Sequence, residues 1–285
     1  MKKLIPKFFQ LLSILSPYLA AKLALKLFSH PRRKPRSDEE MEFLATGKQI
    51  TFQSQRKART WGKGPVVWLL HGWESRGSTF YKLIPLLVDK DYQVIAWDGP
   101  AHGDSPGDST HVPDYAKSLS IDMNENLFNE PIAILGHSFG GAALAILAKI
   151  HKMPAKVIIA SSPARVAGVF SRFTKMIKLG KKATLRFISL SENDTGYTLN
   201  GASLISNDIS KTSDVLVIHD KGDDVIPFED FKVLKDTWQS GQFIATENLG
   251  HRLTIKDPEI LKTIVGFITD DTNHYEPETV IKKTE

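Results

Sequence analysis

The sequence predicts an α/β protein built on a doubly wound, mostly parallel sheet. Two observations predict it. Short, continuous apolar runs such as Val66–Leu70 alternate with longer amphipathic stretches, as they do where strands buried on both faces are joined by crossover helices. The run that begins at Pro131 leads directly into Gly136-His137-Ser138-Phe139-Gly140 and then into an Ala- and Leu-rich helix. This order of strand, tight turn and helix presents Ser138 at the edge of the sheet where parallel strands end.

The same reasoning assigns the remaining elements in chain order. Strands are predicted at 48–53, 66–70, 93–97, 131–135, 156–160, 215–218 and 242–246, and helices at 37–45, 79–90, 114–128, 228–238 and 258–268. The first strand alternates polar and apolar residues and is expected at an edge of the sheet. We expect residues 1–46 to be a basic amphipathic helical segment and linker, 47–269 the main domain, and 270–285 a polar tail that frays.

The charge of the chain is divided unevenly. Residues 1–36 hold nine Lys or Arg and no acidic residue, so the rest of the chain contains 28 basic and all 32 acidic residues. A body with this mild acidic excess argues against a nucleic-acid partner. The chain has no cysteine, no histidine–carboxylate group with metal-ligand spacing and no phosphate-cradling glycine loop. We therefore expect neither a metal nor a cofactor.

The basic segment is predicted to form two short helices. In the first, apolar residues recur at helical spacing from Ile5 to Leu15. Ser16-Pro17 is typical of a helix cap followed by proline at the first helical position, and Leu19, Leu23 and Leu27 then share one face. A proline-punctuated linker with basic residues at 32, 33, 34 and 36 follows.

Four interpretations of this segment remain open. The helices could dock on the protein's own surface, lie in a membrane interface with the lysines toward anionic lipid, belong to a signal peptide, or span a membrane. The charge-free stretch from Phe8 to Ala21 is shorter than the roughly 20 residues that a span needs. We expect a cytoplasmic protein, with peripheral membrane contact through residues 1–36 as the alternative, and a segment that catalysis does not require.

One long interval interrupts the alternation of strands and helices. It separates the strand near Ala160 from the strand near Val215, and it contains a predicted basic amphipathic helix at 165–179 and a mixed stretch at 187–208. An insertion at about 163–213 follows the end of a strand, where ligands bind in open α/β sheets. We favour a small lid over the site; an enlarged connection without contact to substrate is the alternative.

Ser138 is the candidate nucleophile. A turn this tight forces the serine into a strained backbone conformation that exposes its hydroxyl, and Gly136 and Gly140 leave room where a Cβ would clash. A serine hydroxyl needs an adjacent base, usually histidine. His251 is the candidate base, because it follows the last long strand and Gly250 allows the chain to turn there.

The histidine base needs an acid to orient it, and three are available after the strand at 215–218. We choose Asp223, because Gly222 lets the loop turn back, with Asp224 as the second choice. Asp220 directly follows the strand. We expect the two acids that are not used to be solvated.

The tetrahedral intermediate of acyl transfer needs hydrogen-bond donors. The backbone amide of Phe139 is one candidate, and the amide of Trp73, in the loop that follows His71-Gly72, is the other. His71 is expected to be structural. The loop 98–105 is expected to shape the wall of the site, with His102 buried and hydrogen-bonded.

Together, His71-Gly72-Trp73, the Gly136–Gly140 motif, Asp223 before Pro227 and Gly250-His251 resemble the α/β-hydrolase fold superfamily over about residues 48–269. The resemblance implies a triad of Ser138, Asp223 and His251, a cap made by the insertion and a small-molecule acyl substrate. An ester is the expected substrate. The alternatives are an acyltransferase, an amidase, a carbon–carbon bond hydrolase or a membrane-associated binding protein without activity. Asp220 is a departure, because many members have glycine after the strand-end histidine.

Overall fold

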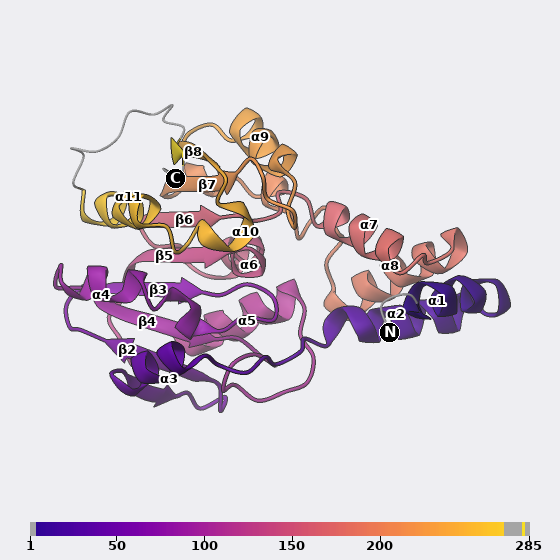
Figure 1. Ribbon diagram of the computed structural model, residues 1–285, viewed down its shortest axis with the longest axis horizontal. Coiled ribbons are helices and arrows are strands. Elements are labelled where there is room, and N and C mark those ends of the chain that lie inside the picture. Colours follow the sequence, from indigo (N-terminus) through magenta and orange to yellow (C-terminus); the bar gives the residue numbers. More distant parts are fainter. Residues whose placement is uncertain (1–3, 271–280, 283–285) are drawn as a thin grey trace.

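The strands form one sheet in the part of the chain that the computed structural model describes, residues 4–270 and 281–282. Their bounds are β1 Lys48–Thr51, β2 Lys57–Trp61, β3 Val66–Leu70, β4 Gln93–Asp98, β5 Pro131–His137, β6 Lys156–Ala160, β7 Asp214–Asp220, β8 Gln242–Glu247 and β9 Ile281–Lys282. The order across the sheet is β1-β2-β4-β3-β5-β6-β7-β8-β9 (Figure 1). Strand β2 pairs antiparallel with β1 and with β4, and the other pairs of the described strands are parallel. The predicted mostly parallel sheet is confirmed.

Helices cover both faces of this sheet. Their bounds are α1 Leu4–Leu15, α2 Pro17–Ser29, α3 Asp38–Ala45, α4 Leu83–Val88, α5 Val112–Met123, α6 Phe139–Ile150, α7 Val166–Met176, α8 Lys181–Thr195, α9 Phe228–Thr237, α10 Gly250–Leu253 and α11 Pro258–Thr269. Side chains alternate along β3, so Trp68 and Leu70 pack with α5 and α6, whereas Val67 and Leu69 pack with α4 and α11. These two apolar layers enclose the strands whose carboxyl ends carry the candidate site.

Strand β2 and helix α8 were not predicted from the sequence, and the prediction around residue 80 was wrong. Strand β2 is antiparallel and only partly buried, so it lacks the continuous apolar run that marks the parallel strands. Helix α8 buries few residues within a polar sequence. The helix predicted at 79–90 is instead a 3-10 turn, Gly77–Phe80, followed by α4.

The polar tail also departs in part from expectation. Residues 281–282 pair with Thr246 and Glu247 of β8 as the short strand β9, so the prediction that this part frays is wrong. Pairing with β8 satisfies backbone groups that an edge strand leaves open. The remaining residues after 270 lie outside the part of the chain described.

Helices α1 and α2 form a hairpin, here called the N-terminal hairpin, which packs against the protein itself. Ser16 caps α2 as predicted, its hydroxyl accepting a hydrogen bond from the Leu19 amide. Ala20, Ala21 and Ala24 are fully buried where α2 meets α8. Farther along α2, the ring of Phe28 lies 4.8 Å from that of Phe170 on α7. One face of the hairpin therefore docks on the protein's own surface, which was one of the four interpretations.

The basic linker after the hairpin is bound to the body of the protein. The guanidinium of Arg33 donates to the carbonyl oxygens of Gly103, Ser105 and Gly107, and that of Arg36 lies 2.9 Å from Asp104. These contacts hold the linker against the loop that follows β4. Its arginines are therefore occupied by protein groups.

The insertion between β6 and β7 contains α7, α8 and two short 3-10 turns, Leu204–Ser206 and Ile209–Lys211. The helix predicted at 165–179 is present as α7. Together with the N-terminal hairpin, these helices stand beyond the carboxyl ends of the parallel strands (Figure 1). A lid role for the insertion stays a prediction.

Candidate active site

Ser138 occupies the turn between β5 and α6. Its φ of 53° and ψ of −113° lie outside the usual regions for a residue with a side chain. The turn is crowded as the sequence predicts: a Cβ at Gly136 would lie 2.6 Å from Gly141 Cα, and one at Gly140 would lie 2.5 Å from the carbonyl oxygen of Leu70. Because no larger residue fits, these glycines allow the strained serine to exist.

The three side chains predicted from the sequence meet in the structure. Ser138 Oγ lies 3.0 Å from His251 Nε2, and His251 Nδ1 lies 2.8 Å from Asp223 Oδ2. Because the carboxylate can only accept, His251 Nδ1 carries the proton and Nε2 is left to accept from the Ser138 hydroxyl. His251 lies on the short helix α10, directly after Gly250, whose φ is +61°.

Asp223 is held as an anion. Its side chain is fully buried; Oδ1 accepts from the backbone amides of Val225 and Ile226, each at 2.8 Å. Burial by itself would raise the pKa of Asp223, but the hydrogen bonds from His251 and from these amides outweigh it and lower the pKa. The carboxylate is thus ionised at neutral pH and fixed in the orientation that faces His251.

The other two acids of this loop have different environments. Asp224 is exposed, as predicted. Asp220 is fully buried, so the expectation that it is solvated is wrong. Its carboxylate accepts from the Thr246 hydroxyl at 2.7 Å and from the amides of Leu249 and Gly222. It therefore ties the end of β7 to the segment that carries His251, and this explains why an acid follows the strand.

The two candidate oxyanion donors come from neighbouring loops. Phe139 is the first residue of α6, and Trp73 follows Gly72, where an added Cβ would lie 3.1 Å from Ser138 Cβ. The rings of Trp73 and Phe139 meet edge to face, with centroids 5.1 Å apart. Both loops thus converge beside Ser138, and their half-exposed aromatic rings give this side of the site an apolar lining.

Comparisons with known proteins show which fold this chain has. The family model of the α/β hydrolase fold matches residues 65–187, which include Trp73 and Ser138. A membrane phospholipase A of known structure, described as a bacterial virulence factor, superposes with a TM-score of 0.61 at 17% identity over 96% of this chain and all of its own. The chain has the α/β hydrolase fold.

Curated sequence relatives match this chain over part of their length. A human serine hydrolase-like protein is 36% identical over 112 residues, which is 37% of this chain and 55% of the relative. A pimeloyl-[acyl-carrier protein] methyl ester esterase of Aeromonas hydrophila is 29% identical over 141 residues, which is 45% of this chain and 54% of the relative. The match therefore spans about half the length of each of these relatives.

Two buried histidines hold the loops of the candidate site in place. His71 accepts from the Gly99 amide through Nε2, and His102 accepts from the Glu74 amide through Nε2. In each ring Nδ1 donates to a carbonyl oxygen, that of Gly72 for His71 and that of Pro100 for His102. Burial lowers the pKa of both imidazoles, so both are neutral. Their predicted structural roles are confirmed.

The role of His137 was not apparent from the sequence. The ring is buried, and Nε2 donates to the carbonyl oxygen of His251 at 2.9 Å. Burial, and next the charge of the nearby His251, lower the pKa of His137 to about 4. A neutral His137 therefore holds the backbone of His251, the candidate base, in place. The position of His137 directly before Ser138 was the one sequence signal that pointed to a role in the site.

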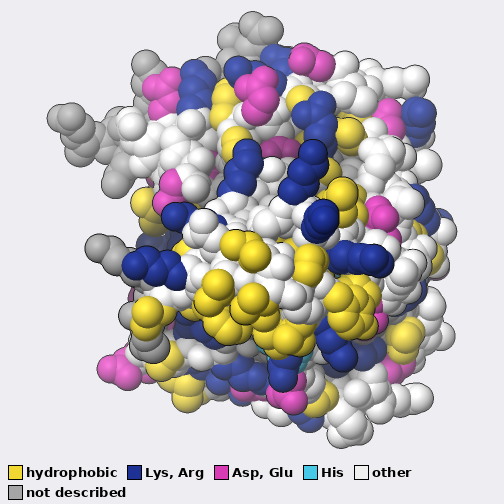
Figure 2. Space-filling model, turned by 90° about the vertical axis from the view of Figure 1, so that its right-hand side faces the viewer, with side chains coloured by type: hydrophobic (Ala, Val, Ile, Leu, Met, Phe, Trp, Pro, Cys, Tyr) yellow, Lys and Arg dark blue, Asp and Glu magenta, His cyan; other side chains and the backbone are white. Residues whose placement is uncertain are grey.

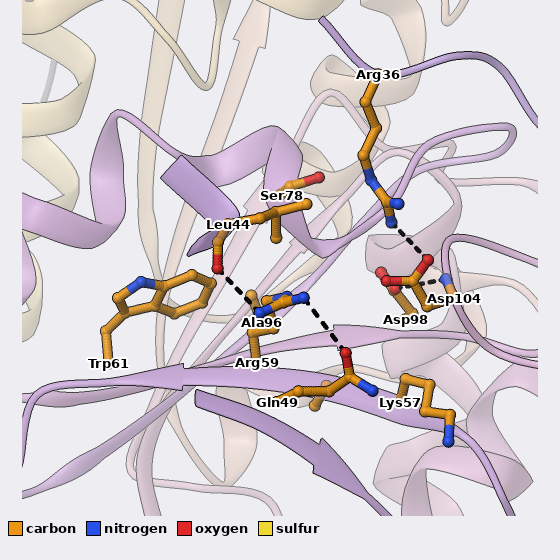
Figure 3. A pocket seen from close by; sticks show the side chains of 11 residues that line it. Arg36, Leu44, Gln49, Lys57, Arg59, Trp61, Ser78, Ala96, Asp98 and Asp104 are labelled. Carbon is orange, nitrogen blue, oxygen red and sulfur yellow. Dashed lines mark hydrogen bonds and ion pairs between the residues drawn. The ribbon is translucent and has the colours of Figure 1, made fainter. Parts of the chain in front are cut away.

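A small cavity lies away from the triad, between the linker and β2 (Figure 3). It has a volume of about 10 Å³, which is room for one water molecule. Arg36 and Asp98 line it, and burial raises the pKa of Asp98 to about 6. Arg59 also lines it, and its Nε has no protein partner there. The cavity is too small for a substrate.

Proposed function

We propose that this α/β-hydrolase cleaves a carboxylic ester through Ser138, with His251 as general base and Asp223 as the acid that orients it. The observation that carries the proposal is the continuous hydrogen-bonded chain from Ser138 Oγ through His251 to Asp223, at 3.0 and 2.8 Å. A binding protein without activity would have no need for a serine strained into this position.

In the proposed reaction, His251 Nε2 takes the proton of Ser138 Oγ as that oxygen attacks the carbonyl carbon. The protonated imidazole, held by Asp223, then gives this proton to the departing alcohol, which leaves an acyl group on Ser138. Water attacks the acyl-enzyme in turn, and its proton passes to His251. The second step releases the carboxylic acid and restores the serine.

The amides of Trp73 and Phe139 are proposed to hold the oxyanion of both tetrahedral intermediates. One such donor is worth about 3 kcal/mol of transition-state stabilisation. The rings of these two residues make the adjacent lining apolar, which suits the hydrocarbon part of an acyl group. Three other reactions use the same residues and remain alternatives: acyl transfer to an alcohol, hydrolysis of an amide, and hydrolysis of a carbon–carbon bond. The name of the Aeromonas relative, a methyl ester esterase, favours an ester.

A fluorophosphonate probe and a series of p-nitrophenyl esters test the proposal. The wild-type protein should be labelled and should release p-nitrophenol, whereas Ser138→Ala should do neither and should keep the wild-type melting temperature. Ser171→Ala, which changes an exposed serine on α7, is the matched control and should be labelled normally. Labelling of Ser138→Ala at the wild-type level would disprove the assignment.

A further inference from the structure

The N-terminal hairpin presents an apolar stripe to solvent. Along α1, Leu4, Phe8, Leu11 and Leu15 follow one another at helical spacing and are 52–76% exposed together with the neighbouring Ile14. A set of large apolar side chains this exposed on one surface is unusual for a protein that meets only water. The stripe continues onto α2 through the exposed Tyr18 and Leu19.

The stripe is distinct from the face by which the hairpin docks. Phe9 is buried, and Ser13 is buried where its hydroxyl accepts a 2.9 Å hydrogen bond from the Gly180 amide, which begins α8. Since α2 is fixed through its alanines as well, the hairpin is anchored with the apolar stripe directed outward. The exposed side chains are thus additional to those that the fold uses.

Basic residues surround the stripe, and acidic residues of the hairpin, α7 and α8 are confined to the last turns of α8, at Glu192 and Asp194. Of the 37 Lys and Arg, nine lie in residues 1–36 and seven in residues 161–191, and neither segment has an Asp or Glu. The rest of the chain carries the other 21 together with all 32 acidic residues. Figure 2 shows the apolar side chains in the middle of this face, with Lys and Arg around them.

A lysine-lined groove adjoins the stripe at the turn between α7 and α8. Its volume is about 360 Å³, and Lys175, Lys178 and Lys181 line it together with Leu179 and Leu185. The contact of Gly180 with Ser13 places this turn directly beside α1. The linker arginines, by contrast, are bound to protein groups, so the lysines of the hairpin and of this turn are the cations that a partner would meet.

We propose that the apolar stripe of the N-terminal hairpin and the lysines of the α7–α8 turn form a surface that binds an anionic lipid bilayer. Apolar side chains flanked by lysines match a bilayer interface, where hydrocarbon lies below a layer of negative headgroups. Among the described residues, no helix is both long and apolar enough to cross a bilayer. A helix of 12 residues such as α1 is about 18 Å long, so it fits along the interface.

Charge favours a bilayer over a second copy of this chain as the occupant. Two identical surfaces that carry many lysines and no acidic residue repel each other, whereas an anionic bilayer attracts them. The surface lies on the side of the molecule to which the carboxyl ends of the parallel strands point (Figure 1). Binding would therefore bring the Ser138 side of the sheet toward the lipid, although the binding itself does not depend on catalysis.

Flotation with vesicles of phosphatidylcholine, alone or mixed with phosphatidylglycerol, tests the proposal on the full chain carrying Ser138→Ala, which separates binding from turnover. We expect binding to the mixed vesicles at low salt and little at about 1 M salt, where charges are screened beyond about 3 Å. Phe8→Ser with Leu11→Ser should weaken binding at least about tenfold, and Lys175→Gln, Lys178→Gln and Lys181→Gln together about 100-fold.

Matched controls replace residues of the same type elsewhere. Ile121→Ser with Leu127→Ser alters two exposed apolar residues at and after the C-terminal end of α5. The triple variant Lys152→Gln, Lys232→Gln and Lys262→Gln removes three exposed lysines. Both controls should bind as the parent does, and all variants should keep its melting temperature. Absence of binding to the mixed vesicles, or equal loss in controls and test variants, would overturn the proposal. The proposal would also be overturned if the vesicles captured no protein and sedimentation showed self-association that Phe8→Ser with Leu11→Ser abolished.

Discussion

The guanidinium of Arg32 donates two hydrogen bonds to the carboxylate of Glu74, from Nε at 2.7 Å and from Nη2 at 3.0 Å. Lys34 adds a third cationic contact to the same carboxylate at 3.2 Å. Glu74 directly follows Trp73, the candidate oxyanion donor, and has a φ of +54°. The linker that follows the N-terminal hairpin therefore helps to fix the loop that would stabilise the oxyanion.

Breaking this ion pair should lower turnover more than stability. Arg32 is mostly exposed, so the pair is worth at most about 1 kcal/mol, which corresponds to about a fivefold change in rate if the loop loses its position. Arg32→Met and Glu74→Gln should each lower kcat between about twofold and fivefold with little change in KM or melting temperature. Steady-state kinetics on p-nitrophenyl esters provide the measurement.

Glu259→Gln, which breaks the exposed pair of Glu259 with Lys262 on α11, is the control and should leave kcat unchanged. An unchanged kcat in both Arg32→Met and Glu74→Gln would show that this loop keeps its position without the ion pair. The contacts of the linker also change the expectation that catalysis does not require residues 1–36. We now expect their deletion to lower kcat.

Replacing each acid of the β7 loop should give three different results. Asp223→Asn should lower kcat/KM by about 10⁴-fold, because His251 loses the acceptor that fixes its tautomer. Asp224→Asn should change nothing, because that side chain is exposed. Asp220→Asn should cost about 2 kcal/mol of stability, because an amide NH₂ cannot accept from Thr246 and Leu249 as the carboxylate does. Kinetics and thermal melts of the three variants distinguish these roles; a larger catalytic loss at Asp224 would move the acid by one residue.

Acid should destabilise this protein between pH 6.5 and about 4. The pKa of His137 falls from 6.5 in the unfolded chain to about 4 in the fold, so the unfolded state binds the extra proton throughout this range. Stability is therefore complete above pH 6.5 and is lost as the pH falls, by about 3 kcal/mol for this residue. The lowered pKa values of His71, His102 and His219 act in the same direction, whereas the raised pKa of Asp98 opposes them.

Urea unfolding at pH 7 and at pH 4.5 measures this loss. His137→Gln keeps a donor for the carbonyl oxygen of His251 but does not titrate, so its stability should fall less between the two pH values than that of the wild type. An equal fall in both proteins would assign the acid sensitivity to the other histidines.

The sequence by itself determined the sheet, the position of Ser138 and the choice of His251. These features depend on local patterns, because a strand buried on both faces must be apolar throughout and a tight turn must have glycine where a Cβ would clash. Asp223 was predictable for a related reason, since Gly222 lets the loop turn. The half-buried antiparallel strand β2 and the polar helix α8 left no such pattern.

Tertiary structure alone decided what distant residues do to one another. Asp220 is buried because β8 and the segment before His251 close over it and supply its donors. The linker arginines, which the sequence offers as free positive charge, are bound to loops some 40 to 75 residues away along the chain. Large apolar side chains lie on more than one side of α1, and only the place of α8 decides which of them are covered. Partners this far apart in the chain leave no periodic signal, because their contacts arise from packing between elements and not from the spacing within one.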